Sequence, residues 1–126
     1  MKGILIDSDI LIEVSRARDQ SILDRWDDLA QNELALFCSP VTVAELWHGA
    51  RAHENAALKA LFAAIQCVPI EMEIGELAGS YLRQYWKSHH LELGDALIAA
   101  TASTQKLDLW TRNRKHYPMK AITFAF

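Results

Sequence analysis

Two carboxylates, Asp7 and Asp9, stand at the end of an apolar run in the segment ILIDSDILIE. A single polar residue separates them, and helix-forming residues follow. A buried strand that ends on paired carboxylates needs a cation or a phosphate to face, because unpaired charge is costly to bury. Three interpretations are open: the nucleophilic aspartate of a phosphatase, the ligand of a metal-dependent nuclease, or an ordinary helix cap. Acids elsewhere in the chain decide between them.

Short apolar runs alternate with helical patterns along the whole chain. The runs predict strands over residues 3–6, 34–38, 67–70, 107–110 and 121–124. Between them, apolar residues recur at the three- and four-residue spacing of helices. Such alternation is typical of an α/β protein with a mostly parallel central sheet, here of about five strands, covered by helices on both faces as three α/β/α layers. We see no repeat or linker, so residues 1–126 are predicted to form a single domain.

Polar side chains follow several of these predicted strands. Asp7 comes directly after the first strand, and Glu45 lies on the helix that follows the second, whose start is marked by Ser39-Pro40. Asp95 begins the helix that leads into the fourth strand, and Asn113 follows that strand closely. Sites in open parallel sheets form beyond the carboxyl ends of the strands. We therefore expect these four side chains to meet at one edge of the sheet.

Three converging carboxylates favour a hard divalent cation. Singly, Asp95 is explained by the dipole of a helix N-terminus, Glu45 by a solvated helix face and Asp7 by a loop. Together they repel one another unless a cation lies between them, and oxygen ligands suit Mg²⁺ or Mn²⁺. Such an ion stabilises the charge that develops on a phosphodiester under attack by water. The chemistry indicated is metal-assisted phosphodiester hydrolysis.

The composition is that of an ordinary globular protein. Apolar residues make up 51% of the chain and charged residues 23%, and the net charge is −3. No apolar run approaches the length of a membrane helix, so we predict no membrane association. The segment RNRKHY is the most basic, and Arg112 and Arg114 within it are candidates for contacting nucleic-acid phosphates. Cys38 and Cys67 are predicted to be buried free thiols, which favours a reducing, cytoplasmic setting.

Four motifs in order resemble those of the PIN-domain ribonucleases, and specifically of the VapC toxins: LIDSDILIE, SPVTVAELWHGAR, LGDALIAATA and LWTRNRKHY. The resemblance covers nearly the whole chain and implies a magnesium-dependent endoribonuclease acting on structured RNA such as transfer or ribosomal RNA. By motif, Asp7, Glu45 and Asp95 match the acidic triad. The resemblance makes Asp7 and Asp95 the direct metal ligands and leaves Glu45 as a ligand directly or through water. Asn113 matches the fourth polar position.

The same resemblance implies partners for this chain. It implies a homodimer and neutralisation by a VapB-like antitoxin, as in type II toxin–antitoxin modules. We expect the hydrophobic residues around Trp26 and within 58–62 to supply part of the interface. One departure concerns the end of the last motif. Many relatives have Lys-Asp-Phe where this chain has Lys115-His116-Tyr117, so an acid is missing there.

Two other functions remain open on the residues alone. A haloacid-dehalogenase-like phosphatase also begins with Asp-x-Asp after a strand, but it needs a turn where Ile10-Leu11 continues into a helix. A non-catalytic α/β binding module would carry the same acids and would fail to bind Mg²⁺. Metal binding and RNA cleavage distinguish both from the nuclease.

Overall fold

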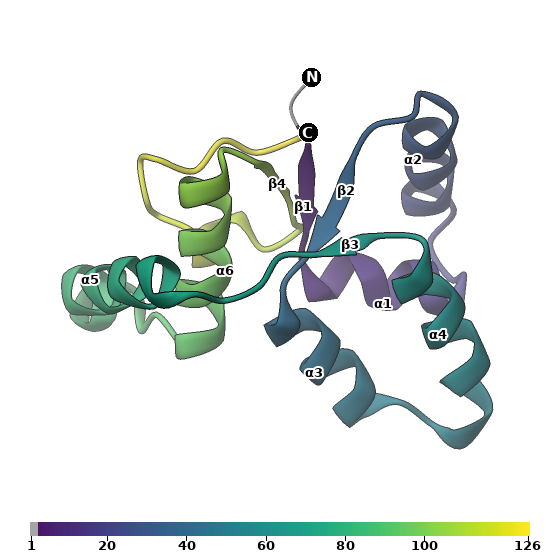
Figure 1. Ribbon diagram of the computed structural model, residues 1–126, viewed down its shortest axis with the longest axis horizontal. Helices are drawn as coiled ribbons and strands as arrows, with labels where there is room; N and C mark the ends of the chain where they lie inside the picture. Colours follow the sequence, from purple (N-terminus) through teal and green to yellow (C-terminus); the bar gives the residue numbers. More distant parts are fainter. Residues whose placement is uncertain (1–2) are drawn as a thin grey trace.

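The computed structural model describes residues 3–126, in which a parallel sheet of four strands is the centre (Figure 1). Its strand order is β3-β2-β1-β4, and each neighbouring pair is parallel. Ile4 of β1 is opposite Leu36 on one side and Asp108 on the other. The strands are β1 (Ile4–Ile6), β2 (Leu36–Cys38), β3 (Gln66–Cys67) and β4 (Asp108–Trp110). The predicted parallel sheet is confirmed.

Helices connect the strands and cover both faces of the sheet (Figure 1). The α-helices are α1 (Ser8–Arg16), α2 (Gln20–Gln31), α3 (Pro40–Gly49), α4 (Asn55–Ala63), α5 (Met72–His89) and α6 (Leu93–Gln105), and the short 3₁₀ helices are η1 (Ala52–Glu54) and η2 (Arg114–His116). Helices α1 to α4 lie on one side of the sheet, and α5 and α6 lie on the other. The three-layer prediction is therefore confirmed.

The alternation of side chains along β1 explains the two cores. Ile4 and Ile6 pack with the helices α1 to α4, whereas Leu5 between them packs with α5 and α6. Successive residues of a strand point to opposite faces, so a strand buried on both sides is apolar throughout. Leu5 and Ile6 are fully buried. This burial fixes the direction in which Asp7, the next residue, leaves the sheet.

The predicted fifth strand is not part of the sheet. Residues 121–124 contribute a single isolated bridge, in which Phe124 pairs with Leu109 of β4. The backbone N–H of Leu109 donates to Thr123 at 2.8 Å, and the N–H of Ala125 donates to Leu109 at 2.9 Å. A turn at 120–121 directly precedes this segment, so too few extended residues remain to form a ladder.

Local capping sets where two helices begin. The hydroxyl of Ser39 accepts a hydrogen bond from the N–H of Val41, and Pro40 is the first residue of α3, as predicted. The carboxylate of Asp7 accepts a hydrogen bond from the N–H of Ser8 at the start of α1. Asp9 then lies in the first turn of α1, where the helix dipole favours a negative charge.

The structure corrects two sequence predictions about burial. Leu58 and Leu61 lie in the core, so they are not available to a partner, whereas Trp26 and Phe62 are only half-buried against it and stay candidates for the predicted interface. Large exposed apolar side chains lie elsewhere, with Trp86 at 61% and Leu93 at 62% exposure. Cys38 is buried as predicted, but Cys67 is exposed because β3 is a two-residue strand at the edge of the sheet.

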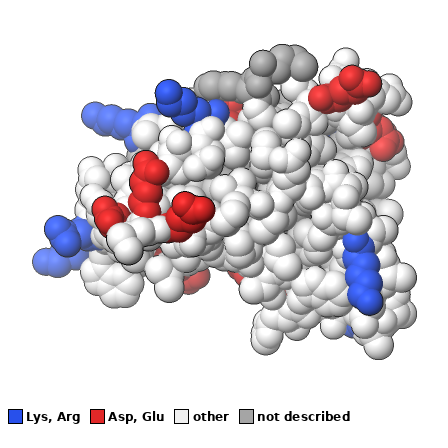
Figure 2. Space-filling model, in the orientation of Figure 1, with Lys and Arg blue, Asp and Glu red and all other residues white. Residues whose placement is uncertain are grey.

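Acidic and basic side chains are both spread over the outer surface (Figure 2), in keeping with the net charge of −3. On the face shown in Figure 2, lysine and arginine side chains stand at separate places along the margin, and acidic side chains gather on the side of α5. Within residues 3–126, no helix combines the length and the apolar character needed to cross a membrane.

Leu5 provides a direct test of the core between β1 and the pair α5 and α6. Leu5→Ala should lower the free energy of unfolding by about 2–5 kcal/mol, because it leaves a cavity in a fully buried site. Met72→Ala is the control, since Met72 is 80% exposed, and it should change that free energy by less than about 0.5 kcal/mol. Urea unfolding followed by circular dichroism measures both. Equal losses for the two variants would contradict this description of the core.

Candidate active site

The four predicted site residues meet at the carboxyl ends of β1 and β4. Asp7, Glu45, Asp95 and Asn113 line one hollow of about 240 Å³, which we call the acidic hollow. Its remaining lining residues are Ser8, Asp9, Glu92 and His116. Four separate parts of the chain therefore supply this hollow, as the topology of a parallel sheet predicts. The convergence inferred from the sequence is observed.

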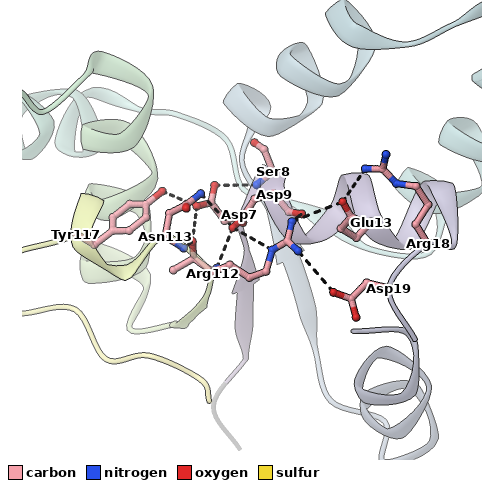
Figure 3. A network of polar contacts seen from close by, with 10 residues as sticks. Asp7, Ser8, Asp9, Glu13, Arg18, Asp19, Arg112, Asn113 and Tyr117 are labelled. Carbon is pink, nitrogen blue, oxygen red and sulfur yellow. Dashed lines mark hydrogen bonds and ion pairs between the residues drawn. The ribbon is translucent and has the colours of Figure 1, made fainter. Parts of the chain in front are cut away.

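Asp7 is the most enclosed of the acids, with 6% exposure. Its Oδ1 accepts the N–H of Ser8 at 2.7 Å. Its Oδ2 accepts two hydroxyl groups, from Thr111 at 2.9 Å and from Tyr117 at 2.8 Å (Figure 3). Hydrogen bonds donated to a buried carboxylate offset part of the cost of removing it from water. Asp7 is thus held in a single orientation.

Asp95 shares a hydrogen-bond donor with Asp7. The hydroxyl of Tyr117 also lies 3.4 Å from Oδ1 of Asp95, so it stands between the two carboxylates. Burial and then the charge of Asp7 raise the pKa of Asp95 to about 6, against the opposing effect of His116. The Nδ1 atom of His116 lies 3.5 Å from Oδ2 of Asp95. Burial and the same two carboxylates also raise the pKa of Tyr117 well above its ordinary value.

Glu45 is the more exposed acid of the predicted triad, and Ser8 positions it. The hydroxyl of Ser8 donates to Oε1 of Glu45 at 2.8 Å and lies 3.1 Å from the hydroxyl of Thr42. These contacts join the first turn of α1 to α3. Glu45 is consequently directed toward the acidic hollow even though it lies on an exposed helix face.

Asn113 reaches the acids through Asp9. Its amide Nδ2 donates to Oδ2 of Asp9 at 3.2 Å, and the backbone N–H of Arg112 donates to the same oxygen at 2.9 Å (Figure 3). The other oxygen of Asp9, Oδ1, is buried and has no hydrogen-bond partner within residues 3–126. Burial and the charge of Asp7 raise the pKa of Asp9. Asp9 is thus more than a first-turn helix acid, because it also lines the acidic hollow.

The two arginines predicted to contact RNA have partners within the chain. The guanidinium of Arg112 lies 3.6 Å from a carboxylate oxygen of Glu13 and 3.6 Å from one of Asp19 (Figure 3). It lies 3.9 Å from Oδ2 of Asp9. The guanidinium of Arg114 stands 4.8 Å above the ring of Phe124. The structure therefore assigns Arg112 first to holding the segment after β4 against α1.

The donor set of the acidic hollow fits a hard divalent cation. Asp7 and Asp95 present carboxylate oxygens on either side of one hydroxyl, and burial and then the charge of Asp7 raise the pKa of Asp95, so a cation between the two acids would be favoured. Within residues 3–126, no three acid, histidine or cysteine side chains gather tightly enough to form a complete protein cage for a metal. Mg²⁺ needs no such cage, because it is commonly bound by one or two carboxylates together with water and substrate phosphate.

Sequence reasoning missed two residues that organise the site. Ser8 lies between the two acids of the first motif, and its hydroxyl positions Glu45. Tyr117 follows β4 by several residues, and its hydroxyl connects Asp7 with Asp95. The position of Ser8 in the motif was a usable signal. Tyr117 had none, because it lies in an irregular segment whose path depends on tertiary packing.

Comparison with known proteins places the chain in a family. Residues 4–122 match the family described as the PIN domain. The chain belongs to the PIN-domain family. It is 40% identical over 121 residues to Ribonuclease VapC10 of Mycobacterium tuberculosis, covering 92% of this chain and 86% of that one. It is 33% identical to Ribonuclease VapC19 of the same species, covering 91% and 92%.

A solved structure supports the same PIN-domain fold. The chain resembles one from the crystal structure of DNA-bound VapBC from Salmonella typhimurium with a TM-score of 0.83. The match covers 98% of this chain and 97% of that one at 16% identity. At this identity the likeness concerns the fold alone. It agrees with the three-layer arrangement.

Asp95 should make the stability of this PIN domain depend on pH. Its pKa of about 6 in the folded state lies above the ordinary 3.8, so the folded protein binds a proton more tightly than the unfolded chain does. Stability contributed by this group is therefore greatest at low pH and falls as the pH rises from about 4 to about 6. Asp95→Asn should remove this loss.

At pH 7 without divalent ions, Asp95→Asn should raise the free energy of unfolding by about 1–2 kcal/mol, a value reduced from the full shift because solvent screens a partly exposed group. Urea unfolding at pH 4 and pH 7 measures the change, and Asp27→Asn on the exposed face of α2 is the control. Added Mg²⁺ should raise the melting temperature of the wild type and leave Asp95→Asn unmoved. If Mg²⁺ does not change the melting temperature of the wild type, the proposed metal site is wrong.

Proposed function

We propose that this PIN-domain protein is a metal-dependent endoribonuclease. The observation that carries the proposal is the pair of carboxylates, Asp7 and Asp95, arranged around the hydroxyl of Tyr117 in an open acidic hollow. Two relatives that span most of the chain are named ribonucleases. The phosphatase alternative has no such support, since the family match over residues 4–122 is to the PIN domain.

Asp7 and Asp95 would hold the cation, Mg²⁺ or alternatively Mn²⁺, with Glu45 as a further ligand directly or through water. Bound there, the cation supplies Lewis-acid stabilisation of the charge that develops on the phosphodiester. Tyr117 and Ser8 keep the carboxylates in place by hydrogen bonding. Asn113 acts as a positioning residue, because its amide donates a hydrogen bond to Oδ2 of Asp9. The other oxygen of Asp9 has no partner within residues 3–126.

The biological setting follows from the family. We infer that the chain is the toxin of a type II toxin–antitoxin module, works in the cytoplasm, and cleaves structured RNA such as transfer or ribosomal RNA. A VapB-like protein is the partner that restrains it, in keeping with relatives named VapC and a structural neighbour solved as VapBC. Arg112 and Arg114 remain candidates for phosphate contact at the rim of the site.

RNA cleavage should require the acids of the hollow. Asp7→Asn, Glu45→Gln and Asp95→Asn should each lower cleavage by orders of magnitude, since each removes a charge that holds or positions the cation. Asn113→Ala should lower turnover with little change in RNA affinity. Gel analysis of cleaved transfer RNA with Mg²⁺ and with a chelator provides the measurement, and Asp27→Asn is the control. Full activity in Asp95→Asn would refute the assignment.

We also infer a homodimer that uses α5 and the start of α6. A hollow of about 710 Å³ there is lined by Leu82, Trp86, Leu91 and Leu93, with Arg83 and Lys87 beside them. Leu91 also lines the neighbouring hollow that contains Asp95. A second copy related by a two-fold axis would cover this apolar surface and bring Arg83 and Lys87 toward the acidic margin of its partner.

Trp86→Glu should convert the dimer to a monomer, because it places a charge in the centre of the apolar contact. Light scattering measures the change from twice 14.2 kDa to 14.2 kDa. Trp47→Glu on α3 is the control, since Trp47 is also exposed but lies in the other helical layer. A wild type that is monomeric at high concentration would contradict the dimer.

A further inference from the structure

A second hollow, lined by basic side chains, lies at the far end of α1 from the acids. It has a volume of about 340 Å³, and its lining includes Arg16, Arg18, Arg51, His53 and Glu54. Arg16 ends α1, Arg18 lies in the turn before α2, and the other three belong to the segment of η1. We call it the arginine hollow. The acidic residues that form the active site contribute nothing to it.

The arginines of this hollow differ in how they are held. Arg16 donates from Nε to Oε2 of Glu54 at 3.0 Å, and both side chains are largely buried, at 19% and 14% exposure. Oε1 of Glu54 accepts the backbone N–H of Arg51 at 2.9 Å, which fixes the start of η1. The guanidinium of Arg51 has no ion pair within residues 3–126. That of Arg18 is paired with Glu13 at 2.7 Å, but its side chain is still 57% exposed. Glu54 thus anchors the frame, and Arg18 and Arg51 are available to a ligand.

Two helices connect the arginine hollow with the acidic hollow. α1 begins with Ser8 at the acids and ends with Arg16 at the arginines, and α3 carries Glu45 near its middle and ends just before Arg51. The two helices start beneath the strand ends and extend to the same side of the molecule (Figure 1). At about 1.5 Å per residue, α1 separates the hollows by roughly 13 Å. A short stretch of a nucleic-acid strand is long enough to reach both.

We propose that the arginine hollow binds backbone phosphates of the RNA substrate away from the bond that is cut. The inference rests on the proposed ribonuclease function. The acidic hollow repels a phosphate backbone, and Arg112 and Arg114 beside it also contact Glu13 and Phe124 of the same chain, so we expect cations further from the acids to add to the affinity. Arginine suits this role because its planar guanidinium donates paired hydrogen bonds to a phosphate. Phosphate contacts there fix the position of the strand without reading its sequence.

The salt dependence of RNA binding tests this role. Arg18→Gln/Arg51→Gln would be prepared in the Asp95→Asn background, which binds RNA without cutting it. Fluorescence anisotropy of a labelled single-stranded RNA of mixed sequence would be measured over a salt series with chelator present. The slope of log affinity against log salt should fall in magnitude by about 1.4, since each lost phosphate contact on a single strand changes it by ~0.7. Arg16 is left unchanged because it is the ion-pair partner of the largely buried Glu54, whereas Glu13, the partner of Arg18, keeps Arg112 at 3.6 Å.

Two further variants separate charge from structure. Arg18→Lys/Arg51→Lys keeps both charges and should retain most of the slope. Lys106→Gln/Lys120→Gln removes two exposed charges far from both hollows, near the start of β4, and should leave RNA affinity unchanged. Thermal unfolding checks that every variant is folded. Lys106→Gln/Lys120→Gln therefore matches Arg18→Gln/Arg51→Gln in the number of charges removed.

Three results would overturn the proposal. The first is an unchanged slope in Arg18→Gln/Arg51→Gln, and the second is an equal change in the Lys106→Gln/Lys120→Gln control. The third is unchanged RNA binding together with lost binding of the co-expressed antitoxin, which would assign the arginine hollow to an acidic protein segment. If the wild type cleaves no RNA but its binding depends on Arg18 and Arg51, the proposed ribonuclease function fails and the phosphate site stands. If it binds no RNA, both fail.

Discussion

The burial of Asp7 and Asp95 on either side of the Tyr117 hydroxyl is the constraint on which the candidate site depends. Asp7 follows β1 and Asp95 lies in the first turn of α6, and the fold brings the two carboxylates together. Burial raises the pKa of Asp95 to about 6. The surrounding residues compensate only in part. Tyr117 donates between the two acids, Thr111 donates to Asp7, and His116 lies beside Asp95. A cation bound between the two carboxylates would offset both their burial and their mutual repulsion, which is the physical reason to expect one there.

Packing on both faces of the sheet holds these clustered acids in place. The strands are short, and β1, from which Asp7 leaves, is buried on both faces, so the sheet resists local movement at that point. α6 presents small buried residues, among them Ala96, Ala99 and Ala100, which let it lie close against α5 and the sheet. Asp95 in its first turn is consequently brought near Asp7 and kept there.

Arg112 organises the opposite side of the site by a different route. Its guanidinium lies among Asp9, Glu13 and Asp19, and Glu13 is in turn paired with Arg18. This network joins the segment after β4 to α1 and to the turn before α2 (Figure 3). It carries Asn113 into hydrogen-bonding distance of Asp9. A basic motif that the sequence associates with RNA thus serves the architecture of the protein first.

The sequence by itself determined the strand–helix alternation, the parallel sheet and the convergence of Asp7, Glu45, Asp95 and Asn113, because these follow from local periodicity and from the geometry of strand ends. Tertiary structure decided what local patterns do not encode. A turn left residues 121–124 with one bridge to β4, and packing buried Leu58 while exposing Trp86. The hydrogen bond of Tyr117 and the ion pairs of Arg112 depend on residues about a hundred positions apart in the chain. Long-range contacts of this kind leave no periodic signal, so only the folded chain reveals them.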